Sequence, residues 1–409
     1  MEKEIAALEI RSKTILLVLG NVQDNKVNIT NKVVRPLSVA LKDGEVLDSS
    51  SLTNDIKNIL TIEDKEHNLK INVNEVALVL PPYSLEVYSS RKQTTVISRS
   101  YKIEKIDISN DLMMLKKERI PNRNNSIIDI IPNFFVIDGN KKFTEPPLGE
   151  TSTQILVDAN IYSLNTNLVQ DLMDAVAHAG IKIRRNVIAP IAASQLFANY
   201  KYSVSTYILV DSGRKTTSLS FVGNNVVYSS KYFSFGFENL IDKVVKGFNL
   251  LRVDAEELIN LYGYDDRKST LNPAICKSTI NGREVKFYQD DLNVIVVEYF
   301  QEYLTKLMSS LEDIANSYSK KLDPLNLVFI GENFKINGIK NYLNKFIKGY
   351  ICNFPILPNV EIQDSSLVNC AGAIFLSSVY KGSLEDDMKG RIGEINREKE
   401  SYSETRDEL

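Results

Sequence analysis

Two stretches of this chain share one layout, and this duplication constrains the fold more than any other feature. Each stretch is an apolar strand that leads into a hairpin. The first runs from Ala6 to Asn31, and the second from Tyr207 to Tyr228. Helical patterns follow both, so the 409 residues predict two facing α/β lobes of similar build.

The second hairpin carries a candidate phosphate site. Asp211 ends its first strand, and Gly213, Thr216 and Thr217 follow in the turn. Backbone amides in such a turn can point at a phosphate, and an acid at the strand end can hold magnesium through water. An Asp-x-Gly turn after a strand is more often only a turn, so these residues alone leave both interpretations open.

Composition and charge exclude several classes of protein. Lysine plus arginine (49) nearly balance aspartate plus glutamate (52), and no long basic stripe with interleaved aromatics occurs, which argues against nucleic acid as a partner. The three cysteines lie far apart without a CxxC pair, which argues against disulfides and a zinc site. Neither a signal peptide nor an apolar run of about 18 residues is evident, so we expect a cytoplasmic protein.

Two helices of the second half are predicted from local signals. Asp254 and Glu257 form a capping pattern, with Val253 and Leu258 as a hydrophobic staple. A long amphipathic helix is predicted from Leu292 to Tyr318, and its apolar stripe is typical of core packing.

Longer stretches resemble a known family. The segment YILVDSGRKTTSLSFVGNNVVYSSKYFSFG is similar to the second phosphate loop of the actin, sugar-kinase and heat-shock chaperone superfamily. Ser126 to Leu164 resembles the insert peculiar to the cell-division protein FtsA. NLVFIGENFKINGI is similar to the adenosine-side glycine turn, and NCAGAIFLS to the last helix of the first lobe. By these agreements in order, the chain is identified as a divergent FtsA-type protein.

The resemblance implies an actin-like (ribonuclease H-like) two-lobed α/β fold with an FtsA-type 1C (SHS2) insert. The implied first lobe, or 1A, covers 1–80 and continues at 161–200, with the 1C insert at 81–160. The implied second lobe, or 2A, covers 201–235 and continues at 322–365, with the 2B part at 236–321. A closing helix (366–382) and a disordered tail (383–409) follow.

The resemblance also implies a role. FtsA proteins bind the carboxy-terminal peptide of FtsZ, tether its filaments to the inner membrane face at the division site, and polymerise through 1C. It implies a scaffold rather than an enzyme, with ATP and magnesium as possible cofactors. Lys306 is the nearest basic candidate for the FtsZ contact. The implied cofactor-binding residues, with Asp211 also as the magnesium ligand through water, are Asp211, Gly213, Thr216, Thr217, Gly236, Glu256, Gly331 and Gly338.

Several departures from the family pattern put nucleotide binding in doubt. Side chains replace glycine or a small residue at Arg11, Arg214, Lys215 and Glu332, and Ile259 replaces an expected lysine. The cations either swing aside to pair with phosphate or fill the cleft and bond to its acids. We expect the second arrangement, and therefore weak or absent ATP binding and hydrolysis.

Two alternatives remain. One is a pilus-assembly relative with the same fold and insert, and the other is a small-molecule kinase of the same superfamily. A kinase needs a positioned acid and glycines for close phosphate approach, and this chain lacks the glycines. The family's terminal amphipathic membrane helix is not visible after Lys381, so we expect membrane contact from another surface or a partner.

Overall fold

The computed structural model describes residues 4–42, 44–64, 69–199, 205–267, 273–317, 325–355 and 364–379. The predicted tail (383–409) lies outside the described residues. The chain divides into two compact units. The larger is built from Met1–Leu85 and Thr166–Ser377, and the smaller contains Glu86–Asn165. No helix among the described residues is long and apolar enough to cross a membrane.

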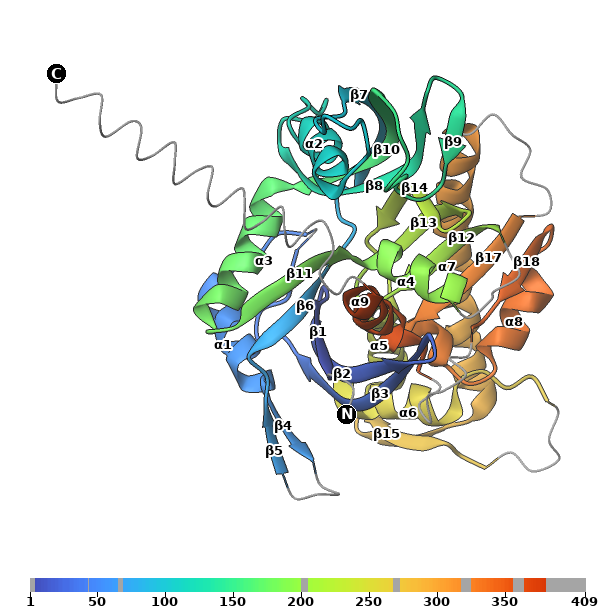
Figure 1. The fold of residues 1–409 in the computed structure, drawn as a ribbon. Helices are drawn as coiled ribbons and strands as arrows, with labels where there is room; N and C mark the ends of the chain where they lie inside the picture. Colours follow the sequence, from blue (N-terminus) through green and yellow to red (C-terminus); the bar gives the residue numbers. More distant parts are fainter. Residues whose placement is uncertain are drawn as a thin grey trace. The chain divides into compact units, whose positions relative to one another are not determined.

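The larger unit contains two five-stranded sheets with the same topology (Figure 1). The order of the first sheet is β11-β6-β1-β2-β3, and that of the second is β18-β17-β12-β13-β14. In each sheet, three consecutive strands form an antiparallel meander. The first strand of the meander also pairs, in parallel, with a strand that comes later in the chain. The strands of the first sheet are β1 (Ile5–Ile10), β2 (Thr14–Gln23), β3 (Lys26–Pro36), β6 (Glu75–Leu80) and β11 (Lys182–Ile188). Those of the second are β12 (Thr206–Ser212), β13 (Thr217–Gly223), β14 (Val226–Phe233), β17 (Leu325–Gly331) and β18 (Tyr350–Asn353).

The two meanders turn in the same way. Asp24 and Asn25 have φ of 48° and 59°, and Asn224 and Asn225 have φ of 49° and 65°. Consecutive left-handed residues form the tight hairpin turns that match the strand twist, and Asn and Asp tolerate this conformation. The predicted duplication is confirmed. We call the parts of the larger unit built on the first and second sheets the first and second lobes.

Helices cover both sheets (Figure 1). Those of the first lobe are α1 (Ser49–Ile59), α3 (Thr166–His178), α4 (Ala189–Asn199) and α9 (Val368–Val379). Those of the second lobe are α5 (Phe237–Phe248), α6 (Arg252–Tyr262), α7 (Gln289–Ser317) and α8 (Ile339–Phe346). Two short hairpins, β4–β5 (Thr61–Asp64, Leu69–Asn72) and β15–β16 (Cys276–Ile280, Arg283–Phe287), and two single turns, η1 (Glu332–Lys335) and η2 (Ser365–Leu367), complete the unit.

Helix α7 is the predicted long helix. Its apolar stripe is buried in the core of the second lobe, where Tyr299 stacks on Phe235 with ring centroids 5.2 Å apart. The prediction for α6 is wrong at its start. The helix begins at Arg252 with Leu251 at the cap, and Val253 is 75% exposed, so it forms no staple. The Arg252 side chain bonds to Asp242 and Glu238 of α5, which supports an earlier first turn than the Asp254 pattern predicts.

The smaller unit is a four-stranded sheet with one helix on one face (Figure 1). Its strand order is β7-β10-β8-β9, all antiparallel. The apolar side of α2 (Lys105–Lys116) packs on the sheet through Ile108 and Leu115, both fully buried. The strands are β7 (Glu86–Thr95), β8 (Asn125–Ile137), β9 (Lys141–Phe143) and β10 (Gln154–Asn165).

Candidate functional site

Two equivalent turns meet between the lobes of the larger unit. In the β1–β2 turn the Arg11 amide donates to the Thr14 carbonyl at 2.9 Å, and in the β12–β13 turn the Gly213 amide donates to the Thr216 carbonyl at the same distance. The Lys215 amide donates to the Ser12 hydroxyl across the gap at 3.3 Å. The β12–β13 turn is the one that the sequence singled out as a candidate phosphate site.

Asp211 lies at the base of this gap, beside a second carboxylate. The buried Asn369 of α9 donates through Nδ2 to Glu9 Oε1 at 2.9 Å and to Asp211 Oδ2 at 2.8 Å. Burial raises the pKa of Asp211, while the nearby charge of Arg11 opposes that rise. Sequence reasoning missed Asn369, although the segment that contains it had been matched to the closing helix.

Arg11 occupies the first turn, where the family pattern has glycine. Its side chain is only 10% exposed. Its Nη2 donates to Glu9 Oε2 at 2.7 Å and also to the Ser366 carbonyl. Burial acts to lower the pKa of Arg11, but the charges of Glu9 and Asp211 more than reverse this, so the pKa is raised and the guanidinium stays charged.

Arg214 occupies the second turn in a comparable way. Its Nη1 and Nη2 donate to the two carboxylate oxygens of Glu256 at 2.7 and 2.8 Å, a bidentate pair. Its Nε donates to Glu238 Oε1 at 2.6 Å, and Nη1 lies 3.6 Å from Glu332 Oε2. Three carboxylates from α5, α6 and η1 therefore surround one guanidinium.

Glu238 joins the two lobes. Its carboxylate accepts from Lys13 Nζ of the first lobe at 2.7 Å, as well as from Arg214 and Arg252 of the second. Burial acts to raise the pKa of Glu238, but its bonds to Lys13 and Arg214 outweigh this and lower it to about 2. The carboxylate is therefore ionised at neutral pH and bonded to three cations.

The two threonines of the second turn have different surroundings. Thr216 Oγ1 lies 3.0 Å from the Tyr83 hydroxyl. Thr217 is fully buried, and its hydroxyl donates to the Phe235 carbonyl at 2.8 Å. A cavity of only about 50 Å³ remains here, lined in part by Glu9, Arg11, Asp211, Thr216 and Tyr83.

Three of the candidate glycines, Gly236, Gly331 and Gly338, lie where main chains approach closely. A Cβ on Gly236 would lie 2.5 Å from the Gly213 carbonyl oxygen, and one on Gly338 would lie 1.8 Å from the Tyr264 carbonyl oxygen. A Cβ on Gly331 would lie 2.3 Å from the Ser212 carbonyl oxygen. Packing of the chain on itself accounts for these glycines without a ligand.

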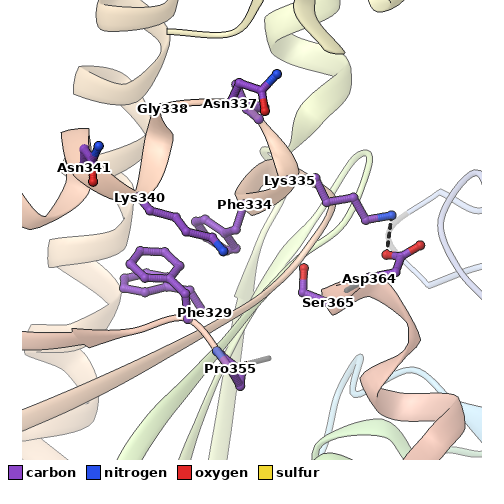
Figure 2. A pocket seen from close by; sticks show the side chains of 12 residues that line it. Phe329, Phe334, Lys335, Asn337, Gly338, Lys340, Asn341, Pro355, Asp364 and Ser365 are labelled. Carbon is purple, nitrogen blue, oxygen red and sulfur yellow. Dashed lines mark ion pairs between the residues drawn. The ribbon is translucent and has the colours of Figure 1, made fainter. Parts of the chain in front are cut away.

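The adenosine-side turn borders a larger cavity of about 540 Å³ (Figure 2). Phe329 and Phe334 line it, and Gly338 lies on its wall (Figure 2). Lys335 and Asp364 form a 2.5 Å ion pair beside it. Neither Glu256 nor Ile259 lines this space, and Ile259 is buried in the core of the second lobe.

The structure thus brings some predicted residues together and leaves others apart. Asp211, Gly213, Thr216 and Gly236 lie at the two facing turns, and Glu256 reaches them through Arg214. Gly338 lies away from them at the larger cavity. Lys306 is exposed on α7, with Nζ 5.5 Å from the centroid of the Phe235 ring. Among the described residues, no group of three His, Cys, Asp or Glu side chains could hold a metal ion.

Known proteins with similar sequences are cell-division proteins. FtsA of Buchnera aphidicola subsp. Baizongia pistaciae is 22% identical over 310 residues, which cover 76% of this chain and 70% of that protein. FtsA of Streptococcus pneumoniae is 22% identical over 341 residues, with 81% and 71% covered, and FtsA of Bacillus subtilis is 20% identical over 312 residues, with 75% and 69% covered. No protein-family model matches the chain.

Three solved structures of similar fold confirm the actin-like two-lobed fold. A chain of the PilM–PilN type IV pilus biogenesis complex has a TM-score of 0.57 at 18% identity, with 94% of this chain and 99% of that chain covered. MreB5 of Spiroplasma citri bound to AMPPNP has a TM-score of 0.53 at 11% identity, with 95% and 98% covered. The ethanolamine utilization protein EutJ from Carboxydothermus hydrogenoformans has a TM-score of 0.52 at 13% identity, with 92% and 91% covered.

Proposed function

We propose, from the premise that this chain is a divergent FtsA-type protein of the actin-like superfamily, that it is a cell-division scaffold whose cleft is held by ion pairs instead of nucleotide. The observation that carries the proposal is the bidentate pair of Arg214 with Glu256, flanked by Glu238 and Glu332. The guanidinium occupies the turn at which a phosphate would need unobstructed access to the backbone amides.

The charges of the cleft support this assignment. A phosphate that approached the second turn would have to displace Arg214 from carboxylates, which would then repel the phosphate at short range. Lys13 and Arg11 are likewise paired, with Glu238 and Glu9. Fixed cations and anions thus neutralise one another, and the space of about 50 Å³ next to Asp211 is far smaller than a ligand site needs.

Magnesium ATP is therefore expected to give no micromolar binding heat with the full chain. The measurement is isothermal titration calorimetry on the wild type, on Asp211→Ala, and on Asp254→Ala as a control at an exposed acid on α6. Micromolar affinity that Asp211→Ala abolishes and Asp254→Ala retains would contradict the ion-paired cleft and restore a nucleotide site at Asp211, Gly213, Thr216 and Thr217.

The scaffold would carry the FtsZ carboxy-terminal peptide on the 2B part, near 236–321. Helix α7 is the proposed wall of the groove, with Lys306 as an exposed cation for the acidic-apolar peptide. Self-association into filaments and a position at the cytoplasmic face of the membrane complete the proposed role.

Reversal of charge at Lys306 is expected to weaken binding of the FtsZ tail peptide at least fivefold, because one attractive pair becomes a repulsive one. Fluorescence anisotropy of a labelled peptide measures this effect. Lys348→Glu, an exposed lysine of the second lobe outside 236–321, is the matched control and should change the affinity little. Equal affinity for the wild type and Lys306→Glu would remove Lys306 from the contact.

A pilus-assembly role is the second candidate, and one observation favours it. The PilM chain resembles this chain over nearly the full length of both proteins. Parallel pull-downs with an FtsZ tail peptide and a PilN peptide separate the two roles. A kinase is disfavoured, because Glu238 and Glu256 are both ion-paired and Asp211 accepts a hydrogen bond from Asn369.

A further inference from the structure

The smaller unit has a concentration of positive charge that the balanced composition of the chain conceals. Residues 97–123 contain seven cations and four acids, in a protein whose net charge is −3. Two of those acids, Asp107 and Asp111, lie on α2 and are fully buried. A third, Glu118, forms an ion pair with Lys92 at 2.5 Å. The charge that this segment presents to solvent is therefore strongly positive.

We call the exposed cations of this segment the basic face. None of them forms an ion pair within the part of the chain that the structure describes, so no internal acid neutralises them. Two exposed acids lie nearby: Glu104, at the N-cap of α2, and Glu150, whose carbonyl accepts from the Ile103 amide at 2.8 Å. The residues of the basic face are Arg99, Lys102, Lys105, Lys116, Lys117, Arg119 and Arg123.

Large apolar side chains lie in the same segment and are also exposed. Ile97 is 63% exposed, Tyr101 50% and Met114 48%. Tyr101 also has a φ of 55°, a left-handed conformation that is unfavourable for a bulky side chain. Its amide donates to the Ser98 carbonyl and its carbonyl accepts from the Ser152 amide, both at 2.9 Å, and these bonds hold the strained residue. Backbone strain that presents an aromatic ring to water points to a binding role.

The shape of this surface restricts its partner. Helix α2 lies across one face of the sheet (Figure 1) and buries Ile108 and Leu115 in the core, whereas Lys105 and Lys116 at its two ends are exposed. The apolar side chains are interspersed with cations along the segment and form no continuous apolar strip. A peptide ligand usually needs a groove with defined pockets, whereas an anionic lipid surface attracts clustered cations without one.

We propose that the basic face, with Ile97, Tyr101 and Met114, binds an anionic lipid surface. Lysine and arginine lie against anionic headgroups, tyrosine prefers the headgroup level, and the aliphatic side chains enter the acyl boundary. The inference deepens the proposed function, on which it rests for the membrane as the place of action. The proposal places the contact with the lipid surface on the smaller unit.

The test is flotation of the full chain with vesicles of phosphatidylcholine that contain either none or 30 mol% phosphatidylglycerol. The wild type is expected to float with the anionic vesicles alone, and less so as salt rises. The quadruple variant Lys102→Gln, Lys105→Gln, Lys116→Gln and Lys117→Gln is expected to lose at least tenfold in affinity, because each cation at an anionic surface contributes a roughly fivefold factor. The matched control carries the same change at four exposed lysines of the larger unit, Lys26, Lys57, Lys231 and Lys348.

Tyr101→Asn provides a second variant, whose loss of lipid affinity could not be explained by a loss of folding stability. Asparagine accepts positive φ, so the fold should be as stable as the wild type or more stable, whereas affinity for anionic vesicles should fall severalfold. Equal flotation of the wild type and the quadruple variant overturns the proposal, as does equal loss in the matched control. Capture of an oligoglutamate peptide without flotation also overturns it and makes the face a protein-docking surface.

The two proposals fail separately. A chain that binds the FtsZ tail but does not float with anionic vesicles contradicts only the lipid surface. A chain that floats through the basic face but does not bind the tail contradicts only the proposed function.

Discussion

Replacement of Arg214 by methionine is expected to lower the free energy of unfolding of the larger unit by about 3 kcal/mol. The variant keeps the length of the side chain but leaves Glu256 and Glu332 without their guanidinium. Removing one partner of a largely buried ion pair typically costs about 3–5 kcal/mol. The Arg214 side chain is 15% exposed and that of Glu256 is 32% exposed, so water offsets part of that cost.

Denaturant unfolding followed by circular dichroism measures this loss. The matched control is Arg252→Met, which removes an arginine that also bonds to Glu238 but is 41% exposed, and which should cost under about 1 kcal/mol. The effect of Arg214→Met should shrink toward pH 4, because the abandoned carboxylates can then take up protons. Equal losses from the two variants, or a loss independent of pH, would show that Arg214 is not the centre of the network.

Local sequence patterns were sufficient to predict the two hairpins and the long helix of the fold. The two hairpins could be found because alternating strands and their turn residues lie within about 25 positions of each other. The long helix α7 was predictable for the same reason, since its apolar residues recur at helical spacing. The start of α6 was not, because the bonds from Arg252 to α5 prevailed over the capping pattern of Asp254.

The chemistry of the cleft could be predicted only in outline. The sequence shows arginine where family members have glycine, but it does not show which way such a side chain points. The partners of Arg214 are 24, 42 and 118 positions away, and Arg11 bonds to the carbonyl of Ser366, 355 positions away. Asn369 was missed for the same reason, since its amide bridges two acids that come from different strands.

The basic face illustrates a different limit of sequence reasoning. The acids of residues 97–123 are interspersed among the cations, so the sequence pattern is typical of a mixed, solvated segment. Burial of Asp107 and Asp111 removes half of those acids from the surface. Burial depends on how α2 packs against the sheet, and no charge count along the chain contains that information.

The burial of Asp111 has a consequence for stability. Asp111 is fully buried on α2, and its desolvation raises the pKa to about 6, with the nearby charge of Asp107 acting in the same direction and the Thr94 hydroxyl against it. The folded state therefore prefers the protonated acid more than the unfolded state does. The contribution of Asp111 to stability is highest below the ordinary pKa of 3.8, falls as pH rises from there to about 6, and stays at the lower level above that.

Asp111→Asn is accordingly expected to stabilise the smaller unit at pH 7.5 by about 1–3 kcal/mol and to have little effect near pH 4. Asparagine has the shape of the protonated acid and carries no charge to desolvate. Because the chain has two units and need not unfold in one step, the measurement is hydrogen exchange of the α2 and β7 amides, corrected for the intrinsic effect of pH.

The neighbouring acid on the same helix supplies a control of opposite sign. Asp107 is equally buried, but its carboxylate accepts from the Ile97 amide at 2.8 Å and from the Glu104 amide at 2.9 Å. Asp107→Asn should therefore destabilise the unit at pH 7.5, by about 1–2 kcal/mol, since it weakens two charge-assisted bonds at the helix start. If both variants change protection in the same direction at pH 7.5, the two carboxylates do not differ in their hydrogen bonds, and the pH dependence assigned to Asp111 is wrong.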